Sequence, residues 1–498
     1  MPDAQGEGHL PPYSLLYLER SLRVFDIEVF IIDERIQTAW KTDIKSISGD
    51  LILAGVSVAL GNQISSAIKI TQFLKEEVRA PVIWGGWLVT WMPKMCLQEP
   101  NVDFISIGQG EGPLSSLVKH LLSSDSSNSG QLSSVPGLGF KTEEKLIINQ
   151  PEPFNAFLAY PSVDWSLVNL RDYIVFRKSG QAVFHYFASE GCPHQCNFCF
   201  LARGWKGKWF PNETDDIINE LRYILSQAPE VSFIFFDDIN FFADRGFVID
   251  LCTKLIENRF SFSWNASGHI RSLLKDFSDE DLQLIKQAGC TSIFVGAESG
   301  DELVLKNLNK DLSVYEIGLF VEKFHRAGIK VSCSFMVLFP GHKGNDLRKT
   351  LKLIMRLLLR SEYFHCAVHT YYPLINNYYH KKAKEYNFRF PDTLTELVGF
   401  LSVQQTFPWQ KKRDLNLLQY FGRFYLRYFR VHHPGQKKKS LDFKSFLAVI
   451  IRMRFKLNTT YLPVLGWIYC HLNRRSGKKD RSYHSPNSEF ITGRIKSS

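Results

Sequence analysis

Short apolar runs and amphipathic stretches alternate along the first 150 residues. Apolar runs of about four to eight residues predict buried strands, and longer stretches with helical periodicity predict helices. The predicted strands lie at 27–32, 51–58, 81–86, 102–107 and, as a pair, within 135–149. The predicted helices lie at 13–22, at 64–79 and from Pro113 onward. This alternation is typical of a parallel sheet covered by helices, so the fold class is α/β.

The alternation returns between residues 183 and 372 in longer and more regular units. Strands are predicted at 184–188, 231–237, 262–266, 292–297, 331–337 and 364–370. Helices are predicted between them, at 214–227, 245–258, 279–288, 313–326 and 346–360. Six such units predict an open, partial (β/α)6 barrel with its active site at the carboxyl ends of the strands.

A length of 498 residues exceeds what one hydrophobic core usually serves, so several domains are expected. The predicted order is an N-terminal sheet domain, a linker, the barrel, a mostly helical region and a disordered tail. Their predicted bounds are 1–150, 151–182, 183–384, 385–474 and 475–498.

The formal net charge is +10, and much of the basic excess lies after residue 380 among aromatic residues. Solvated faces of terminal helices account for this pattern, so we expect no nucleic-acid partner. A peripheral contact of this basic, aromatic region with an anionic membrane stays open as an alternative. Nine cysteines without an export segment predict a reducing, cytoplasmic location.

Three cysteines at positions 192, 196 and 199 form a CxxxCxxC motif. Thiolates are soft ligands that select zinc, copper(I) or iron–sulfur clusters. A tetrahedral zinc site needs a fourth ligand, for which His194 is the nearby candidate. Three thiolates on a four-iron cluster instead leave one iron open to a substrate or cofactor. The spacing therefore favours a [4Fe–4S] cluster, and zinc or unrelated buried thiols are the alternatives.

The motif, with Phe198 before its third cysteine, resembles that of the radical S-adenosylmethionine (radical SAM) enzymes. Segments 233–238, 264–271 and 292–300 also resemble this family's second, third and fourth strands. The resemblance implies a [4Fe–4S] cluster held by three cysteines, with S-adenosylmethionine (SAM) bound beside it. The implied cluster ligands are Cys192, Cys196 and Cys199, and the implied SAM contacts are Phe198, Asp237, Asp238, Arg271, Glu298 and Ser299.

The resemblance gives each SAM contact a role. Phe198 would lie beside the adenine, and Asp237 or Asp238 would receive the ammonium group, for which a carboxylate is a suitable partner. Glu298 and Ser299 would reach the ribose or the methionine end, and Arg271 would pair with the carboxylate. Structural roles are the alternatives: Asp238 could cap a loop, Glu298 could cap a helix, and Arg271 could pair with Asp276 or Asp279.

The loop after the fifth strand departs from the family pattern. The family has a glycine, a glutamate and a threonine at positions where this chain has Leu338, His342 and Lys343. Leu338 adds bulk near the expected cofactor, and the usual carboxylate is absent. We expect His342 to be a surface loop residue rather than a proton-transfer group.

The N-terminal sheet domain resembles the Rossmann-like, cobalamin-binding domain that precedes the radical domain in one branch of the radical SAM family. The resemblance lies in Trp84-Gly-Gly-Trp87, Asp103 and Gly108-Gln-Gly-Glu-Gly112. Its implied cobalamin contacts are Ser57, Gly85, Gly86, Gly110 and Glu111. The branch usually opens with a further strand, which is missing here. A DxHxxG motif is also absent, so no histidine is nominated as a cobalt ligand.

The resemblance implies an oxygen-sensitive enzyme that cleaves SAM to a deoxyadenosyl radical. Its electron would come from an external donor such as flavodoxin or ferredoxin. We expect cobalamin-dependent methylation of an unactivated carbon, and hence a methyltransferase. Two alternatives stay open: a radical cyclase or rearrangement enzyme without methyl transfer, and a non-catalytic iron–sulfur redox or binding protein.

Overall fold

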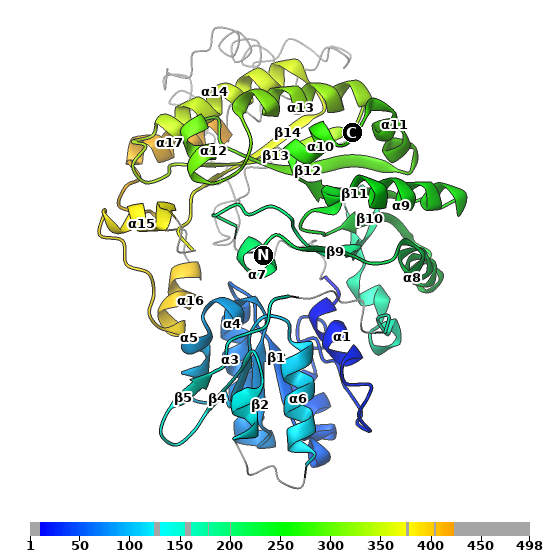
Figure 1. Ribbon diagram of the computed structural model, residues 1–498, viewed down its shortest axis with the longest axis vertical. Helices are drawn as coiled ribbons and strands as arrows, with labels where there is room; N and C mark the ends of the chain where they lie inside the picture. Colours follow the sequence, from blue (N-terminus) through cyan, green and yellow to red (C-terminus); the bar gives the residue numbers. More distant parts are fainter. Residues whose placement is uncertain are drawn as a thin grey trace, which may run out of the picture. The chain divides into compact units, whose positions relative to one another are not determined.

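The computed structural model describes residues 10–123, 130–154, 161–177, 179–199, 201–374, 378–402 and 405–422 (Figure 1). The chain divides into two compact units. The first comprises Met1–His185, Asn219–Val231 and Phe390–Gln405, and the second comprises Tyr186–Ile218, Ser232–Arg389 and Thr406–Ser498. The predicted tail at 475–498 and most of the late basic residues lie outside the described residues.

The first unit contains a five-stranded mixed sheet in the order β1-β2-β3-β4-β5. Strands β1, β2 and β3 pair in parallel, and β4 and β5 form the predicted antiparallel pair. The bounds are β1 (Ala54–Ser57), β2 (Val82–Gly85), β3 (Phe104–Ser106), β4 (Leu138–Lys141) and β5 (Leu146–Ile148).

Both faces of the central strand of this sheet are covered, because three successive residues of β2, Val82, Ile83 and Trp84, are all buried. Trp84 on β2 packs into one core cluster with the helices α3, α4 and α5, whereas its neighbour Ile83 packs into another with α6. The helices of the unit are α1 (Tyr13–Arg20), α2 (Trp40–Ser46), α3 (Gln63–Phe73), α4 (Trp87–Trp91), α5 (Pro93–Leu97), α6 (Glu111–Leu121) and, near its C-terminal segment, α16 (Leu394–Ser402).

The strand predicted at 27–32 is wrong. This segment is in no helix or strand, although Ile27 and Val29 are half-buried against the core and their neighbours Glu28 and Phe30 are exposed. Alternating burial requires only that one side of an extended segment be covered. An extended segment can have alternating burial without pairing to another strand. The hydrophobic pattern alone therefore does not distinguish a paired strand from an unpaired extended segment.

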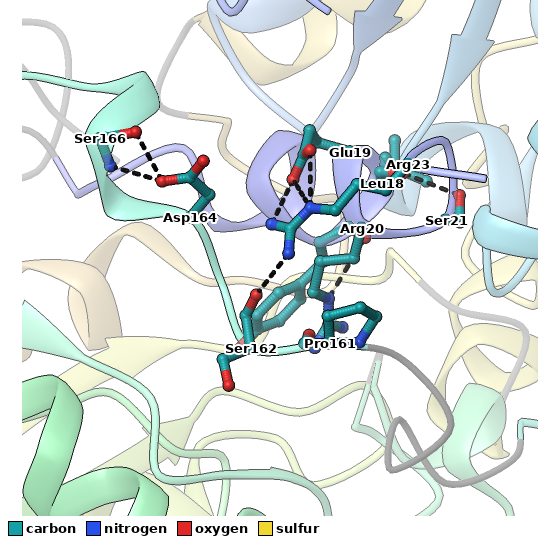
Figure 2. Close-up of polar contacts among 10 residues, drawn as sticks. Leu18, Glu19, Arg20, Ser21, Arg23, Pro161, Ser162, Asp164 and Ser166 are labelled. Carbon is teal, nitrogen blue, oxygen red and sulfur yellow. Dashed lines mark hydrogen bonds and ion pairs between the residues drawn. The ribbon is translucent and has the colours of Figure 1, made fainter. Parts of the chain in front are cut away.

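Arg20, the last residue of α1, and Arg23, in the turn after it, hold the chain that follows the sheet, as Figure 2 shows. Arg23 makes a bidentate ion pair with Glu19, with Nη2 2.6 Å from Oε2, and its Nη1 donates to the carbonyl of Ser162 at 3.1 Å. Arg20 donates to the carbonyl of Pro161 at 3.4 Å. The described part of the predicted linker is therefore fixed to the first helix.

The barrel is a seven-stranded sheet in the order β14-β13-β12-β11-β10-β7-β6. All six predicted strands are present, and the pairings from β10 to β14 are parallel. β6 is antiparallel to β7 and has only two residues, which is too short for a hydrophobic pattern to reveal. The bounds are β6 (Val175–Phe176), β7 (Ala182–Tyr186), β10 (Val231–Phe236), β11 (Ser263–Gly268), β12 (Cys290–Glu298), β13 (Lys330–Val337) and β14 (Phe364–Thr370).

The helices of the barrel begin and end at the residues that local chemistry favours. Ser278 and Ser313 form capping boxes with Asp281 and Glu316, and Gly328 ends a helix in the left-handed conformation. The bounds are α8 (Thr214–Gln227), α9 (Arg245–Glu257), α10 (Ile270–Lys275), α11 (Asp279–Gln287), α12 (Glu302–Asn307), α13 (Val314–Ala327) and α14 (Asn345–Arg360).

The C-terminal part is helical where it is described. It contains α15 (Tyr378–Lys384), α16 and α17 (Lys412–Tyr420). No helix among the described residues is long and apolar enough to cross a membrane.

Candidate functional site

The three cysteines lie on a loop whose two ends are joined by a short antiparallel hairpin. Its strands are β8 (Ser189–Gly191) and β9 (Trp209–Pro211), and Cys192 N donates to the carbonyl of Lys208 at 2.9 Å. Gly191 has a φ of +87°, and a Cβ at this position would collide with the same carbonyl. Glycine is therefore required where the chain turns into the cysteine loop.

The cysteine loop also docks onto the chain that leaves α12. Asn197, between the second and third cysteines, donates its backbone N–H to Leu308 at 3.0 Å and its amide to the carbonyl of Asn307 at 2.7 Å. Asn309 donates back to the carbonyl of Gln195 at 2.9 Å. These contacts fix the loop against residues 307–310.

The thiols of the loop are free of disulfides and close enough to affect one another. Burial raises the pKa of Cys192 and raises that of Cys196 to about 11, and the neighbouring cysteines raise both further. Within the described ranges, no three His, Cys, Asp or Glu side chains are arranged to hold one metal ion. A four-iron cluster takes one thiolate on each of three irons, so three free thiols on one loop provide the ligands that such a cluster needs.

His194, the candidate fourth zinc ligand, lies against other side chains. Its ring stacks on His269 at 3.7 Å, and its Nε2 is 3.3 Å from the hydroxyl of Ser272. Burial lowers the pKa of His194. The imidazole of His194 therefore contacts another ring on its face and a hydroxyl at Nε2.

Lys310 is the principal site residue that sequence reasoning missed. It is 6% exposed, and its Nζ lies 3.3 Å from Glu298 Oε1 and 5.7 Å from the ring centroid of Phe198. Burial lowers the pKa of Lys310, but the attraction of Glu298 and Cys196 outweighs this and raises it. Burial also raises the pKa of Glu298. One lysine in a loop carries no sequence signal, because only the docking of 307–310 on the cysteine loop buries it.

The conformation of Glu298 explains how its carboxylate reaches this lysine. Glu298 ends β12 in the left-handed region with a φ of +61°, which is uncommon for a residue other than glycine. A Cβ on Gly296 would collide with the Glu298 carboxylate. Glycine two residues earlier therefore lets the carboxylate fold back to Lys310.

Asp238 anchors the hairpin that closes the cysteine loop. It is 1% exposed and accepts hydrogen bonds from the N–H of Ala188, at 3.2 Å, and from the hydroxyl of Ser189. Burial raises the pKa of Asp238 to about 7, against the effect of these hydrogen bonds. Its neighbour Asp237 is half-buried and donates its backbone N–H to Tyr186.

Asn240 is a second site residue that sequence reasoning missed. It is 1% exposed and lies beside Cys192, whose pKa its amide lowers against the larger effect of burial. Neither polar atom of this amide makes a hydrogen bond of normal geometry within the described part of the chain. Buried polar groups are nearly always paired, so Asn240 has capacity left for a bound group.

Two of the predicted SAM contacts face other partners. Arg271 forms ion pairs with Asp311 and with Glu316, at 3.2 Å for the latter, and not with the residues considered from the sequence. Ser299 is fully buried, and its hydroxyl lies 3.3 Å from that of Thr350 on α14. Their roles toward SAM stay predictions.

The expectation that His342 is a surface residue is wrong. Its side chain is 10% exposed, with Nε2 3.0 Å from the Tyr379 hydroxyl and Nδ1 3.9 Å from Asp301. Lys343 and Gly344 both have positive φ values and turn the loop so that His342 points inward.

In the first unit, the predicted cobalamin contacts lie at the carboxyl ends of the parallel strands. Ser57 and Gly85 end β1 and β2 and pair with each other. Gly86 follows with a φ of +99°, and a Cβ there would come within 2.8 Å of the Val58 carbonyl. Ligands of open parallel sheets bind at this edge.

Gly110 and Glu111 lie at the start of α6, beside the end of β3. Glu111 is buried, and its Oε1 is 3.8 Å from the guanidinium of Arg20. Burial raises the pKa of Glu111. Its Oε1 and the hydroxyl of Ser106 are buried and have no hydrogen-bond partner among the described residues. Polar atoms at this strand end could therefore accept or donate a hydrogen bond to a ligand.

Comparison with models of protein families matches residues 186–354 to the Radical SAM superfamily and residues 4–118 to the B12 binding domain. The chain is a radical SAM protein with a B12 binding domain. The resemblance to these two families that the motifs indicated is confirmed.

Among curated proteins, this radical SAM protein is 24% identical over 369 residues to the "Uncharacterized methyltransferase PH0819" of Pyrococcus horikoshii. That match covers 73% of this chain and 76% of the relative. It is 27% identical over 244 residues to an anaerobic magnesium-protoporphyrin IX monomethyl ester cyclase of a Synechocystis strain, covering 49% of this chain. The chain spans about half the length of that cyclase, with 47% covered.

Among solved structures, the radical SAM methyltransferase TsrM from Kitasatospora setae has a TM-score of 0.57 at 18% identity, over 70% of this chain and 71% of TsrM. The cobalamin-dependent radical enzyme OxsB has a TM-score of 0.61 at 16% identity, over 94% of this chain and 73% of OxsB. These likenesses establish the fold.

The residues of this radical SAM protein fit the cofactors that its two families imply. Three free thiols on a fixed loop suit an iron–sulfur cluster, and the unused amide of Asn240 suits a group bound beside Cys192. The hydroxyl of Ser106, which has no hydrogen-bond partner among the described residues, lies next to the glycine-lined strand ends and suits a polar ligand such as a corrinoid.

Proposed function

We infer that this cobalamin-dependent radical SAM enzyme methylates an unactivated carbon of its substrate. The observation that supports this is the presence, in one chain, of a complete three-cysteine loop and a B12 binding domain with a polar strand edge. When bound, the cluster and SAM supply a radical that removes a hydrogen atom, and the corrinoid supplies a methyl group.

The residues of the barrel would hold these groups and exclude water. Cys192, Cys196 and Cys199 would bind the cluster, and Lys310 would offer a buried positive charge beside them to a carboxylate. Asp238 would keep the hairpin closed through Ser189. Fixed, buried polar groups of this kind orient a reacting partner at little cost in reorganisation.

The first experiment measures corrinoid and iron in protein purified without oxygen from cells supplied with cobalamin. About one corrinoid per cluster is the result expected of a methyltransferase of this class. Incubation with SAM and a strong reductant should then yield both deoxyadenosine and S-adenosylhomocysteine. A loaded cluster without any corrinoid would contradict methyl transfer.

A cyclase is the second candidate, and its support is the similarity to the magnesium-protoporphyrin cyclases. Deoxyadenosine without S-adenosylhomocysteine, in protein that holds a corrinoid, would favour it. Failure to cleave SAM at all would favour a non-catalytic iron–sulfur protein.

A further inference from the structure

His342 is linked to both ends of the short helix α12, which joins the end of β12 to the loop that carries Lys310. Asp301 caps the start of α12, and its carboxylate lies 3.9 Å from Nδ1 of His342. Asn307 is the last residue of the helix, and its amide reaches His342 through the hydroxyl of Tyr379. The loop after β13 therefore holds this helix at its start and at its end.

The hydrogen bonds of Tyr379 run in one direction. Its hydroxyl accepts from the amide of Asn307 at 3.3 Å, and Nε2 of His342 lies 3.0 Å from the same oxygen. A phenol that accepts from an amide still has its own hydrogen to donate, so Nε2 is the acceptor. A phenylalanine at 379 would remove both bonds, and a side chain without an acceptor at 342 would remove one.

These groups lie in the interior of the second unit. Tyr379 is fully buried, with its ring centroid 4.5 Å from that of Phe339, and the side chain of His342 is 10% exposed. A buried polar atom that loses its partner costs free energy, because little water is there to replace it. Each group of the chain therefore depends on its neighbour for its hydrogen bond.

Beyond Asn307 the contacts continue to the cysteine loop. The backbone carbonyl of Asn307 accepts from the side chain of Asn197, between the second and third cysteines, at 2.7 Å. Three residues further on, Lys310 lies beside Phe198, which is a predicted SAM contact. A displacement of Asn307 would therefore disturb both the cysteine loop and the buried positive charge next to it.

The departure from the family pattern at position 342 fits this arrangement. The pattern has a glutamate there, and a glutamate would place a second carboxylate beside the buried Asp301. Two like charges in a buried site disfavour each other. The imidazole of His342 instead offers Nε2 to Tyr379 and turns Nδ1 toward the carboxylate.

We propose that His342 and Tyr379 are positioning residues for SAM. Together they fix α12 and, through Asn307, hold Lys310 and the cysteine loop in the geometry that binds the cofactor. Neither residue needs to touch SAM itself. Binding and cleavage of SAM are common to methylation and cyclisation, so this role does not depend on which of the two proposed functions holds.

Tyr379→Phe removes the hydroxyl and keeps the aromatic ring. The dissociation constant of SAM is measured by equilibrium dialysis on the anaerobic, cluster-loaded protein without a reductant, so that SAM is not cleaved. It should rise about five-fold, the effect of one lost hydrogen bond. Amide exchange should accelerate at 195–199 and 307–310. Tyr173→Phe is the matched control and should change neither, because Tyr173 is also buried and its hydroxyl bonds to Asp33 in the first unit, at 3.3 Å.

Two substitutions at position 342 test the acceptor itself. His342→Gln keeps an acceptor for the hydroxyl of Tyr379, whereas His342→Leu has none. The glutamine variant should bind SAM within about two-fold of the unmutated protein, and the leucine variant about five-fold more weakly. A role in overall stability alone would not make SAM affinity follow the presence of an acceptor.

Native SAM affinity in Tyr379→Phe, equal weakening in Tyr173→Phe, or equal affinities of the two variants at position 342 would overturn the proposal. Unchanged exchange at 307–310 in Tyr379→Phe would overturn it whether or not SAM binds. The proposed methylation is judged separately, from S-adenosylhomocysteine formed by the unmutated protein. Absence of that product contradicts methylation and leaves the expected effects of Tyr379→Phe as they are.

Discussion

The indole N–H of Trp409 donates a hydrogen bond to the backbone carbonyl of Leu338, with an N···O distance of 2.9 Å. Leu338 follows β13 in the left-handed region with a φ of +62°, at the position where the radical SAM pattern has glycine. A non-glycine residue in this conformation costs about 1 to 2 kcal/mol. The segment before α17 thus helps to hold a strained turn beside the expected SAM site.

Replacing Trp409 with Phe should loosen this turn. The ring can still stack on Phe407, which lies 4.8 Å away, but the hydrogen bond to Leu338 is lost. We expect a loss of about 1 kcal/mol in the free energy of unfolding and faster amide exchange across residues 337–345. Hydrogen–deuterium exchange read by mass spectrometry measures the second effect.

Trp264→Phe is the control for this prediction. Trp264 also donates its indole N–H to a backbone carbonyl, that of Ala288 at 2.8 Å, but inside the barrel core. It should lower stability by a similar amount without changing exchange at 337–345. If both variants accelerate exchange there equally, the effect is global and Trp409 has no special role.

Lys310→Met should destabilise the protein and weaken SAM binding. It leaves Glu298 buried without its partner, and breaking a buried ion pair costs about 3 to 5 kcal/mol. The double variant Lys310→Met with Glu298→Gln removes both charges and should recover much of the stability. It should not recover SAM binding, because both the positive charge beside Phe198 and the carboxylate of Glu298, itself a predicted SAM contact, are gone.

Denaturant unfolding and equilibrium dialysis with SAM measure the two effects separately. Recovery of SAM binding in the double variant would mean that Lys310 only neutralises Glu298. Persistence of full SAM affinity in the single variant would exclude the lysine from the site.

The fold followed from the sequence more completely than the site did. The six barrel strands were predicted because each is an apolar run between amphipathic helices, a signal that is local. Lys310 and Asn240 were missed because their burial depends on contacts between distant segments, such as Asn197 with Asn307. The segment 27–32 shows the opposite error, since local alternation suggested a strand that does not pair.

Asp238→Asn should change how stability depends on pH. The pKa of Asp238 is raised to about 7 in the folded protein, above its ordinary value, so the folded state binds the proton more tightly than the unfolded state. The free energy of unfolding of the native protein therefore falls as pH rises from about 4 to about 7, and Asp238 accounts for a fall of at most about 1.4 kcal/mol per pH unit. Asparagine mimics the neutral form and should remove this contribution.

The measurement is the difference in unfolding free energy between the two proteins across pH 4 to 8. The unfolding free energy of the asparagine variant should rise relative to that of the native protein as pH rises, with little further change above about pH 7. If the difference in unfolding free energy stays constant with pH, Asp238 has a pKa near its ordinary value. Its hydrogen bonds would then offset the effect of burial on the charged form.

Gly191→Ala should reduce iron binding by the cysteine loop. The residue has a φ of +87°, and the added methyl group would meet the Lys208 carbonyl that accepts the hydrogen bond of Cys192. Gly180→Ala is a matched control, because Gly180 has a similar φ of +84° but open space where the methyl group would go. Both variants carry the same backbone strain, of about 1 to 2 kcal/mol, so a difference in iron per protein isolates the collision at the hairpin. Native iron content in Gly191→Ala would mean that the loop can bind its metal without the hairpin geometry described above.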